Sequence, residues 1–209
     1  MSRYHAKRRD LAADLLASAL PSAPSGPILE IGSAAESLLG AVGGHLRISS
    51  DIAFPALLEA KGKRLCLDAA LPLPLKDNSL AGIVSGELIE HIVDAQEMIE
   101  EFFRVIKPGG VLVLTTPNLA TLQDRFRFLA GASPRQVDAL HPYLKLHVRP
   151  FTAGSLRALL RACGFEVLAL RSNYVGWQLT AGRWIEWRWP ARIFPTIGGS
   201  LIVSARRTA

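Results

Sequence analysis

Short apolar runs of strand length alternate with segments of helical periodicity along most of the chain. Between Ile92 and Ile106 the apolar residues recur at the spacing of one helical face, whereas residues 111–114 are apolar at every position, as in a parallel strand covered on both faces. Strands are predicted at 28–31, 45–49, 63–67, 80–85, 111–114, 165–170 and 201–205, and helices at 53–60, 92–106, 120–129 and 152–163. This order predicts a doubly wound, parallel α/β sheet, with residues 1–209 forming one domain.

Three segments lie outside this alternation. Residues 1–20 begin basic, but Asp10 and Asp14 interrupt the apolar part, so we predict an amphipathic helix rather than a targeting peptide. Its predicted inward face consists of Leu11, Leu15, Leu16 and Ala19. Residues 131–150 and 172–198 are irregular and are expected to form cap or insertion segments on the domain.

The second of these segments contains all the tryptophans of the chain. Trp177, Trp184, Trp187 and Trp189 are interleaved with Arg183, Arg188 and Arg192. Four interpretations are open: a lid over an apolar substrate, an interfacial membrane contact, a patch that forms a homodimer, or a local core.

The amino-acid composition is typical of a soluble globular protein. Of the 209 residues 49% are apolar and 20% charged, and no apolar run approaches the roughly 18 residues of a membrane span. Cys66 and Cys163 fit neither a metal motif nor a disulfide framework, so both are expected in the core of a cytoplasmic protein.

Charge is distributed unevenly along the chain. The overall net charge is +6, yet residues 111–209 hold 13 Lys and Arg against 4 Asp and Glu, a net +9. This excess makes an anionic partner or substrate plausible, although the basic residues could also be scattered over a solvated surface. No nucleic-acid-binding module is recognisable among them.

Acidic residues follow three successive predicted strands. Glu30 stands two residues before Gly32, Asp51 follows Gly32 by 19 residues, and Asp68 ends the third strand. In Rossmann-type folds such positions bind a nucleotide through backbone N–H groups and ribose hydroxyls. The site is therefore expected at the carboxyl ends of the strands, where Ser85 to Glu87 and residues 115–118 also emerge.

Several motifs together resemble class I S-adenosylmethionine-dependent methyltransferases, particularly the small-molecule group that shares acid-x-x-Glu-His and Lys-Pro-Gly-Gly segments. The motifs are ILEIG, SSDIAFPALLEA, LCLDAALPLPLKDNSLAGIVSGELIEHI, EFFRVIKPGGVLVLTTPN and HVRPFTAGSLRALLRACGFEVL. The resemblance covers residues 27–171. It implies a Rossmann-like, seven-stranded sheet with an antiparallel last strand, S-adenosylmethionine as cofactor, and methyl transfer to a small-molecule acceptor.

The resemblance also implies which residues bind the cofactor. They are Glu30, Gly32 and Ser33 at the methionine part, Asp51 at the ribose, Ile52, Asp68 and Ala69 at the adenine, and Ser85, Gly86 and Glu87 closing the methionine side. The glycine loop departs from the family pattern, because Ala34 and Glu36 replace its second and third glycines. Either the loop takes another path, or cofactor binding is weakened and the protein is a catalytically inactive binding or interaction protein.

Methyl transfer requires the acceptor to be aligned and, where necessary, deprotonated. His91 is the candidate base, with an orienting or packing role inside the GELIEH turn as the alternative. Asn118, Tyr143 and His147 are candidate substrate-binding residues. Because the histidine spacing matches no zinc motif, no metal site is predicted.

Two other enzyme classes fit less well. A nicotinamide oxidoreductase would be expected to have the later glycines and a Tyr-x-x-x-Lys pair, which are missing. The TTPN segment at residues 115–118 also lacks the Asn/Asp-Pro-Pro-aromatic pocket of nucleic-acid amino-methyltransferases.

Overall fold

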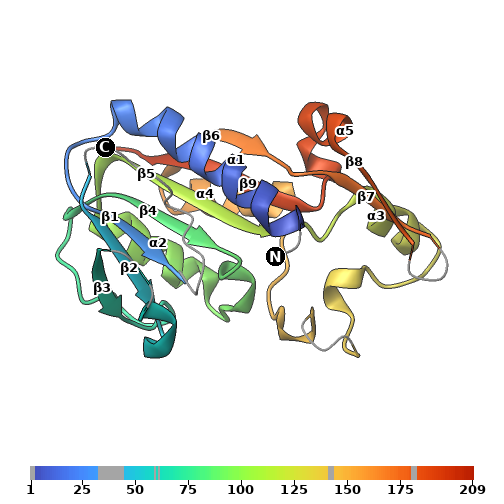
Figure 1. Ribbon diagram of the computed structural model, residues 1–209, viewed down its shortest axis with the longest axis horizontal. Helices are drawn as coiled ribbons and strands as arrows, with labels where there is room; N and C mark the ends of the chain where they lie inside the picture. The colour runs from blue at the N-terminus through green and yellow to red at the C-terminus, as the bar shows by residue number, and fades with distance from the viewer. Residues whose placement is uncertain (1–2, 33–44, 59, 61, 141–143, 180–182) are drawn as a thin grey trace.

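A seven-stranded sheet forms the centre of the protein (Figure 1). The computed structural model describes residues 3–32, 45–58, 60, 62–140, 144–179 and 183–209. In spatial order the strands are β3 (Lys63–Cys66), β2 (Arg47–Asp51), β1 (Ile28–Ile31), β4 (Leu80–Gly86), β5 (Ile106–Pro117), β9 (Ser200–Arg207) and β6 (Phe165–Arg171). Strand β9 runs antiparallel to both of its neighbours, whereas the pairs from β3 to β5 are parallel. The predicted Rossmann-like sheet with an antiparallel last strand is therefore confirmed.

Helices cover both faces of this sheet. The helix α1 (Arg3–Ala19) lies across β5 and β9 on one face (Figure 1), where Leu15 and Leu16 are buried against Val111 and Val113. The opposite face packs against α2 (Ala95–Val105) and α4 (Ala153–Ala162). Alternate residues of β5 point into the two layers, which is why residues 111–114 are apolar at every position.

The ends of several elements differ from the prediction. Residues 89–91 form a 3₁₀ turn, and α2 begins only after Asp94, whose side chain accepts a hydrogen bond from the Glu97 N–H at 3.1 Å. The helix predicted at 53–60 is a single 3₁₀ turn at Phe54–Leu57. Strand β2 starts and ends two residues later than predicted, which places Asp51 inside the strand.

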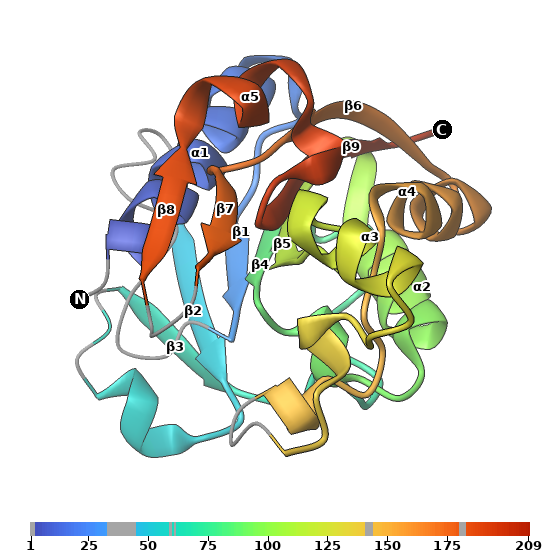
Figure 2. The same ribbon diagram turned by 90° about the vertical axis from the view of Figure 1, so that its right-hand side faces the viewer.

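The segment 172–198 is more regular than predicted. It forms a separate hairpin of β7 (Val175–Gln178) and β8 (Trp184–Trp187), followed by the short helix α5 (Arg188–Ile193) (Figure 2). Trp184, Trp187 and Trp189 are 39%, 40% and 66% exposed, so the interpretation of this segment as a local core is wrong. Among the described residues, no helix is both long enough and apolar enough to cross a membrane.

The two cysteines lie in different environments. Cys163 is buried at the end of α4, as predicted, but Cys66 is exposed. The reason is that β3 is the edge strand of the sheet and its side chains are largely exposed. The expectation that both thiols belong to the core is wrong for Cys66.

Candidate functional site

Parallel pairing brings the predicted cofactor residues to one edge of the sheet. Ile31 of β1 pairs with Ser50 of β2 and with Ser85 of β4, so Gly32, Asp51 and Gly86 emerge side by side. Asp51 accepts a hydrogen bond from the Ala53 N–H and Asp68 accepts one from the Ala70 N–H, each at 2.9 Å. Ile52 is 66% exposed, whereas Ala69 is buried. An exposed apolar side chain next to two acids fits a surface that receives a nucleoside.

Two features of this edge fit the methionine part of a cofactor. Gly32 has a φ of +73°, and among the described residues a Cβ added there would approach nothing nearer than Leu88 at 3.8 Å, so the described part of the chain leaves room for a ligand over its backbone. The buried Ser85 hydroxyl has no hydrogen-bond partner among the described residues.

Glu30 is buried in β1, with its backbone carbonyl accepting from the Ser50 hydroxyl. Ser33, Ala34 and Glu36 lie outside the described residues.

Glu87 forms an ion pair with a residue that the sequence analysis missed. Its carboxylate lies 2.8 Å from the Arg8 guanidinium of α1, and Thr115 donates to it at 3.3 Å. Burial raises the pKa of Glu87, and the positive charge of Arg8 opposes this rise. Glu87 also has a φ of +53°, a left-handed conformation that is rare for a residue with a side chain. One signal in the sequence could have revealed Arg8: it stands four residues before Ala12, on the buried face of α1.

A second carboxylate, Glu90, lies beside His91 and His147. It is only 1% exposed, and the Thr116 hydroxyl donates to its Oε2 at 2.9 Å. Its Oε1 lies 4.0 Å from His91 Nε2, and the rings of His91 and His147 meet edge-on with centroids 5.0 Å apart. Burial, reinforced by the nearby Glu87 carboxylate, raises the pKa of Glu90 to about 8. The acid-x-x-Glu-His motif contains Glu90, but we predicted no role for it.

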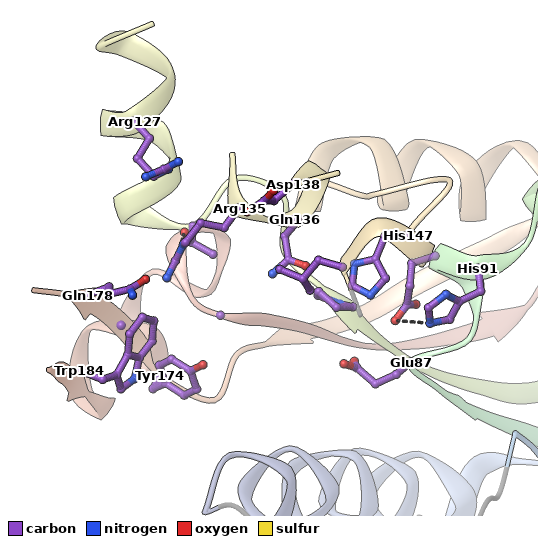
Figure 3. A pocket seen from close by; sticks show the side chains of 16 residues that line it. Glu87, His91, Arg127, Arg135, Gln136, Asp138, His147, Tyr174, Gln178 and Trp184 are labelled. Carbon is purple, nitrogen blue, oxygen red and sulfur yellow. Dashed lines mark hydrogen bonds and ion pairs between the residues drawn. The ribbon is translucent and has the colours of Figure 1, made fainter. Parts of the chain in front are cut away.

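These side chains line one end of a cavity of about 690 Å³. Arg127, Arg135 and Trp184 line its other end, with the Arg135 guanidinium 5.1 Å from the Trp184 ring centroid and 3.1 Å from Asp124 (Figure 3). Both predicted cap segments, 131–150 and 172–198, contribute to the lining. The cavity therefore has an acidic, imidazole-rich end and a cationic, aromatic end.

Only some of the predicted substrate-binding residues line the cavity. His147 lines the cavity, as does His91, which belongs to the 3₁₀ turn rather than to the start of α2. Tyr143 lies outside the described residues. The prediction for Asn118 is wrong, because its side chain is fully buried and holds the backbone together. The amide Nδ2 donates to the carbonyls of Thr196 and Gly198 at 3.0 and 2.8 Å, and Oδ1 accepts from the Ala120 N–H at 3.0 Å.

Asn118→Ala is accordingly expected to affect folding rather than acceptor affinity. It would remove the partner of the Gly198 carbonyl oxygen and of the Ala120 N–H, at a cost of about 2 kcal/mol in the free energy of unfolding. The Thr196 carbonyl oxygen would still accept from Arg125 Nη2 at 2.9 Å. Urea denaturation followed by circular dichroism measures this change. A variant as stable as the wild type would show that these hydrogen bonds are not what holds the segment.

Comparison with known proteins agrees with this geometry. The sequence profile of a methyltransferase-domain family matches residues 4–170. The chain belongs to the class I S-adenosylmethionine-dependent methyltransferase family. The "probable S-adenosylmethionine-dependent methyltransferase" of Mycolicibacterium smegmatis is 38% identical over 95 residues, which are 46% of this chain and 32% of that protein. A ubiquinone/menaquinone biosynthesis C-methyltransferase of Desulfotalea psychrophila is 32% identical over 104 residues, 44% of this chain and 42% of the relative. The chain thus matches about a third to two fifths of the length of these curated relatives.

Solved structures of this methyltransferase family share the fold along almost the whole chain. A SAM-dependent methyltransferase from Archaeoglobus fulgidus superposes with a TM-score of 0.65 at 18% identity, covering 95% of this chain and 94% of that one. One from Thermotoga maritima gives a TM-score of 0.63 at 19% identity, covering 99% and 93%. At this identity the likeness concerns the fold alone.

Proposed function

We propose that this protein is an S-adenosylmethionine-dependent methyltransferase that acts on a small-molecule acceptor. The observation that carries the proposal is the position of the cavity of about 690 Å³, which begins at Glu87, directly after β4. The cofactor's methionine part is expected against Gly32, Ser85 and Glu87, so an acceptor in this cavity would lie next to the methyl group. Family membership and the named relatives support the same cofactor.

Different residues would bind the cofactor and deprotonate the acceptor. S-adenosylmethionine, when bound, supplies an activated methyl group. Asp51 would bind the ribose hydroxyls, Arg8 fixes the Glu87 carboxylate, and His91 lies in the wall of the cavity, where it would take a proton from the acceptor. The imidazole is held in place through Nδ1, which lies 3.0 Å from the Leu146 carbonyl oxygen, and this leaves Nε2 able to accept a proton from the acceptor.

The lining of the cavity favours a particular kind of acceptor. Arg127 and Arg135 would attract an anionic group, and Trp184 and Tyr174 would pack against an apolar or aromatic one. Two relatives are named for such chemistry: the Desulfotalea enzyme for quinone biosynthesis, and a Coxiella burnetii protein, 28% identical over 92 residues, as a malonyl-[acyl-carrier protein] O-methyltransferase. We therefore favour an acceptor that carries a carboxylate or an aromatic ring.

Transfer of labelled methyl groups tests the proposal even though the acceptor is unidentified. The purified protein is incubated with methyl-labelled S-adenosylmethionine and a cell extract, which is then separated into dialysable, protein and nucleic-acid fractions. Label above the protein-free background is expected in the dialysable fraction. Label only in nucleic acid or on the amino-acid side chains of proteins would contradict the small-molecule assignment. Cofactor binding without label in any fraction would favour the alternative of an inactive binding protein.

A further inference from the structure

We infer that Glu90, His91 and His147 form a binding site for a divalent transition-metal ion on the wall of the acceptor cavity. One ligand atom from each residue can be chosen so that all three lie within 4.8 Å of one another. Two ligands that share an ion at about 2.1 Å are roughly 3 Å apart, so a bound ion would draw these side chains slightly inward. His91 and His147 face the same cavity (Figure 3), and Glu90 also lines it.

His91 is already oriented as a metal ligand. Its Nδ1 lies 3.0 Å from the Leu146 carbonyl oxygen, which can only accept, so the ring proton sits on Nδ1. The lone pair of Nε2 then points toward Glu90 Oε1, 4.0 Å away. Histidine ligands of metals are commonly held in this way, through a hydrogen bond from the other ring nitrogen to a carbonyl.

Glu90 supplies the observation that a purely structural role leaves unexplained. The Thr116 hydroxyl holds Oε2, and the Arg149 N–H donates at 3.0 Å to the Glu90 backbone carbonyl, so the residue is fixed from two sides. Its buried Oε1 has no hydrogen-bond partner among the described residues. A buried carboxyl oxygen without a partner is costly unless a proton or a cation lies against it.

A proton shared between Glu90 and His91 would satisfy those two groups only. An ion would engage both of them and also use the imidazole of His147, whose ring lies against that of His91. Two imidazoles and one carboxylate are a donor set that favours metals such as Mn²⁺, Co²⁺ or Zn²⁺ over Mg²⁺ or Ca²⁺, which prefer oxygen ligands.

The consequence for the reaction rests on the proposed function. A metal ion here would bind the acceptor through an oxygen atom and lower the pKa of a hydroxyl group. Oxygen would then be the methylated atom: the hydroxyl proton would pass to solvent, and the oxygen would bond to the methyl carbon as the bond from that carbon to sulfur breaks and S-adenosylhomocysteine leaves. His91 would act as a ligand in place of a proton acceptor. No metal site was predicted because the histidine spacing matches no zinc motif; His91 and His147 are 56 residues apart in the chain and come together only in the fold.

Calorimetric titration with Zn²⁺ tests the site in protein without a histidine tag, after treatment with EDTA and its removal. We expect one saturable site per chain in the wild type, weakened at least tenfold in each of His91→Asn, His147→Ala and Glu90→Gln. The asparagine retains a donor for the Leu146 carbonyl, and the glutamine retains the shape and the Thr116 contact. His45→Asn is the matched control, because His45 Nδ1 also contacts a backbone carbonyl, that of Gly26 at 2.9 Å, and is expected to leave Zn²⁺ affinity unchanged.

Two results would overturn the metal site: no saturable binding by the wild type, or variants that bind Zn²⁺ as the wild type does. Titration of the same protein with S-adenosylhomocysteine separates this failure from failure of the proposed function. If the nucleoside binds and Zn²⁺ does not, only the metal site is wrong. If Zn²⁺ binds and the nucleoside does not, the metal site stands and the methyltransferase assignment is contradicted.

Discussion

Asp51→Ala is expected to weaken S-adenosylmethionine binding roughly 100-fold. The carboxylate emerges from the end of β2 beside Gly32 and Gly86, where it would accept hydrogen bonds from both ribose hydroxyls. Hydrogen bonds to a charged group contribute about 1.5–3 kcal/mol, and about 3 kcal/mol corresponds to 100-fold in affinity. Calorimetry with S-adenosylhomocysteine gives the dissociation constants of variant and wild type.

Asp138→Ala is a matched control for this experiment. Asp138 accepts a hydrogen bond from the N–H two residues ahead, that of Leu140 at 2.9 Å, just as Asp51 does from Ala53. It lies in the acceptor cavity rather than at the end of β2, so its loss should leave cofactor affinity unchanged. Equal affinities for Asp51→Ala and wild type would show that the cofactor does not occupy this edge of the sheet.

Gly110→Ala is expected to lower the free energy of unfolding by about 3 kcal/mol or more, the largest effect of a single methyl group that we predict. The added Cβ would lie 2.5 Å from the Ile106 side chain and 2.8 Å from the Ala81 carbonyl oxygen. Both neighbours belong to the packed centre of the sheet, and the Ala81 carbonyl is backbone that cannot turn aside. Urea denaturation measures the loss.

The adjacent glycine provides the comparison. Gly109 has a φ of +78°, but a Cβ there would meet no atom of the described residues within 4 Å, so Gly109→Ala should cost only the conformational penalty of about 1–2 kcal/mol. We predict that Gly110→Ala lowers the free energy of unfolding more than Gly109→Ala does. Equal losses, or a larger loss at Gly109, would mean that backbone conformation rather than close packing requires glycine in this segment.

The sheet could be predicted from the sequence because its signals are local. An unbroken apolar run such as residues 111–114 indicates a strand with both faces covered, and Thr152 indicates the start of a helix. The predicted ends of helices and strands were less accurate where a side-chain hydrogen bond determines the end. Asp94 accepts the Glu97 N–H and so begins α2 later than the apolar spacing suggests, and Asp51 binds the Ala53 N–H where a helix was expected.

It could also be predicted that the proposed cofactor residues meet at one edge of the sheet, because parallel strands end together. The acceptor cavity could not be predicted, since it combines the 3₁₀ turn after β4, the 131–150 segment and the β7–β8 hairpin, whose approach depends on tertiary packing. The ion pair between Arg8 of α1 and Glu87 depends on tertiary packing in the same way. Arg8 and Glu90 were missed for this reason. Asn118 was misjudged because a polar residue at a strand end is equally suited to binding a ligand and to holding buried carbonyls.

Direct titration of the wild-type protein with S-adenosylhomocysteine tests the central claim, that this chain binds the methyltransferase cofactor although Ala34 and Glu36 replace two loop glycines. We predict one site per chain with a dissociation constant in the micromolar range, together with a rise in melting temperature as the ligand is added. If millimolar ligand gives no heat of binding and no shift in melting temperature, the claim that this chain binds the cofactor is contradicted.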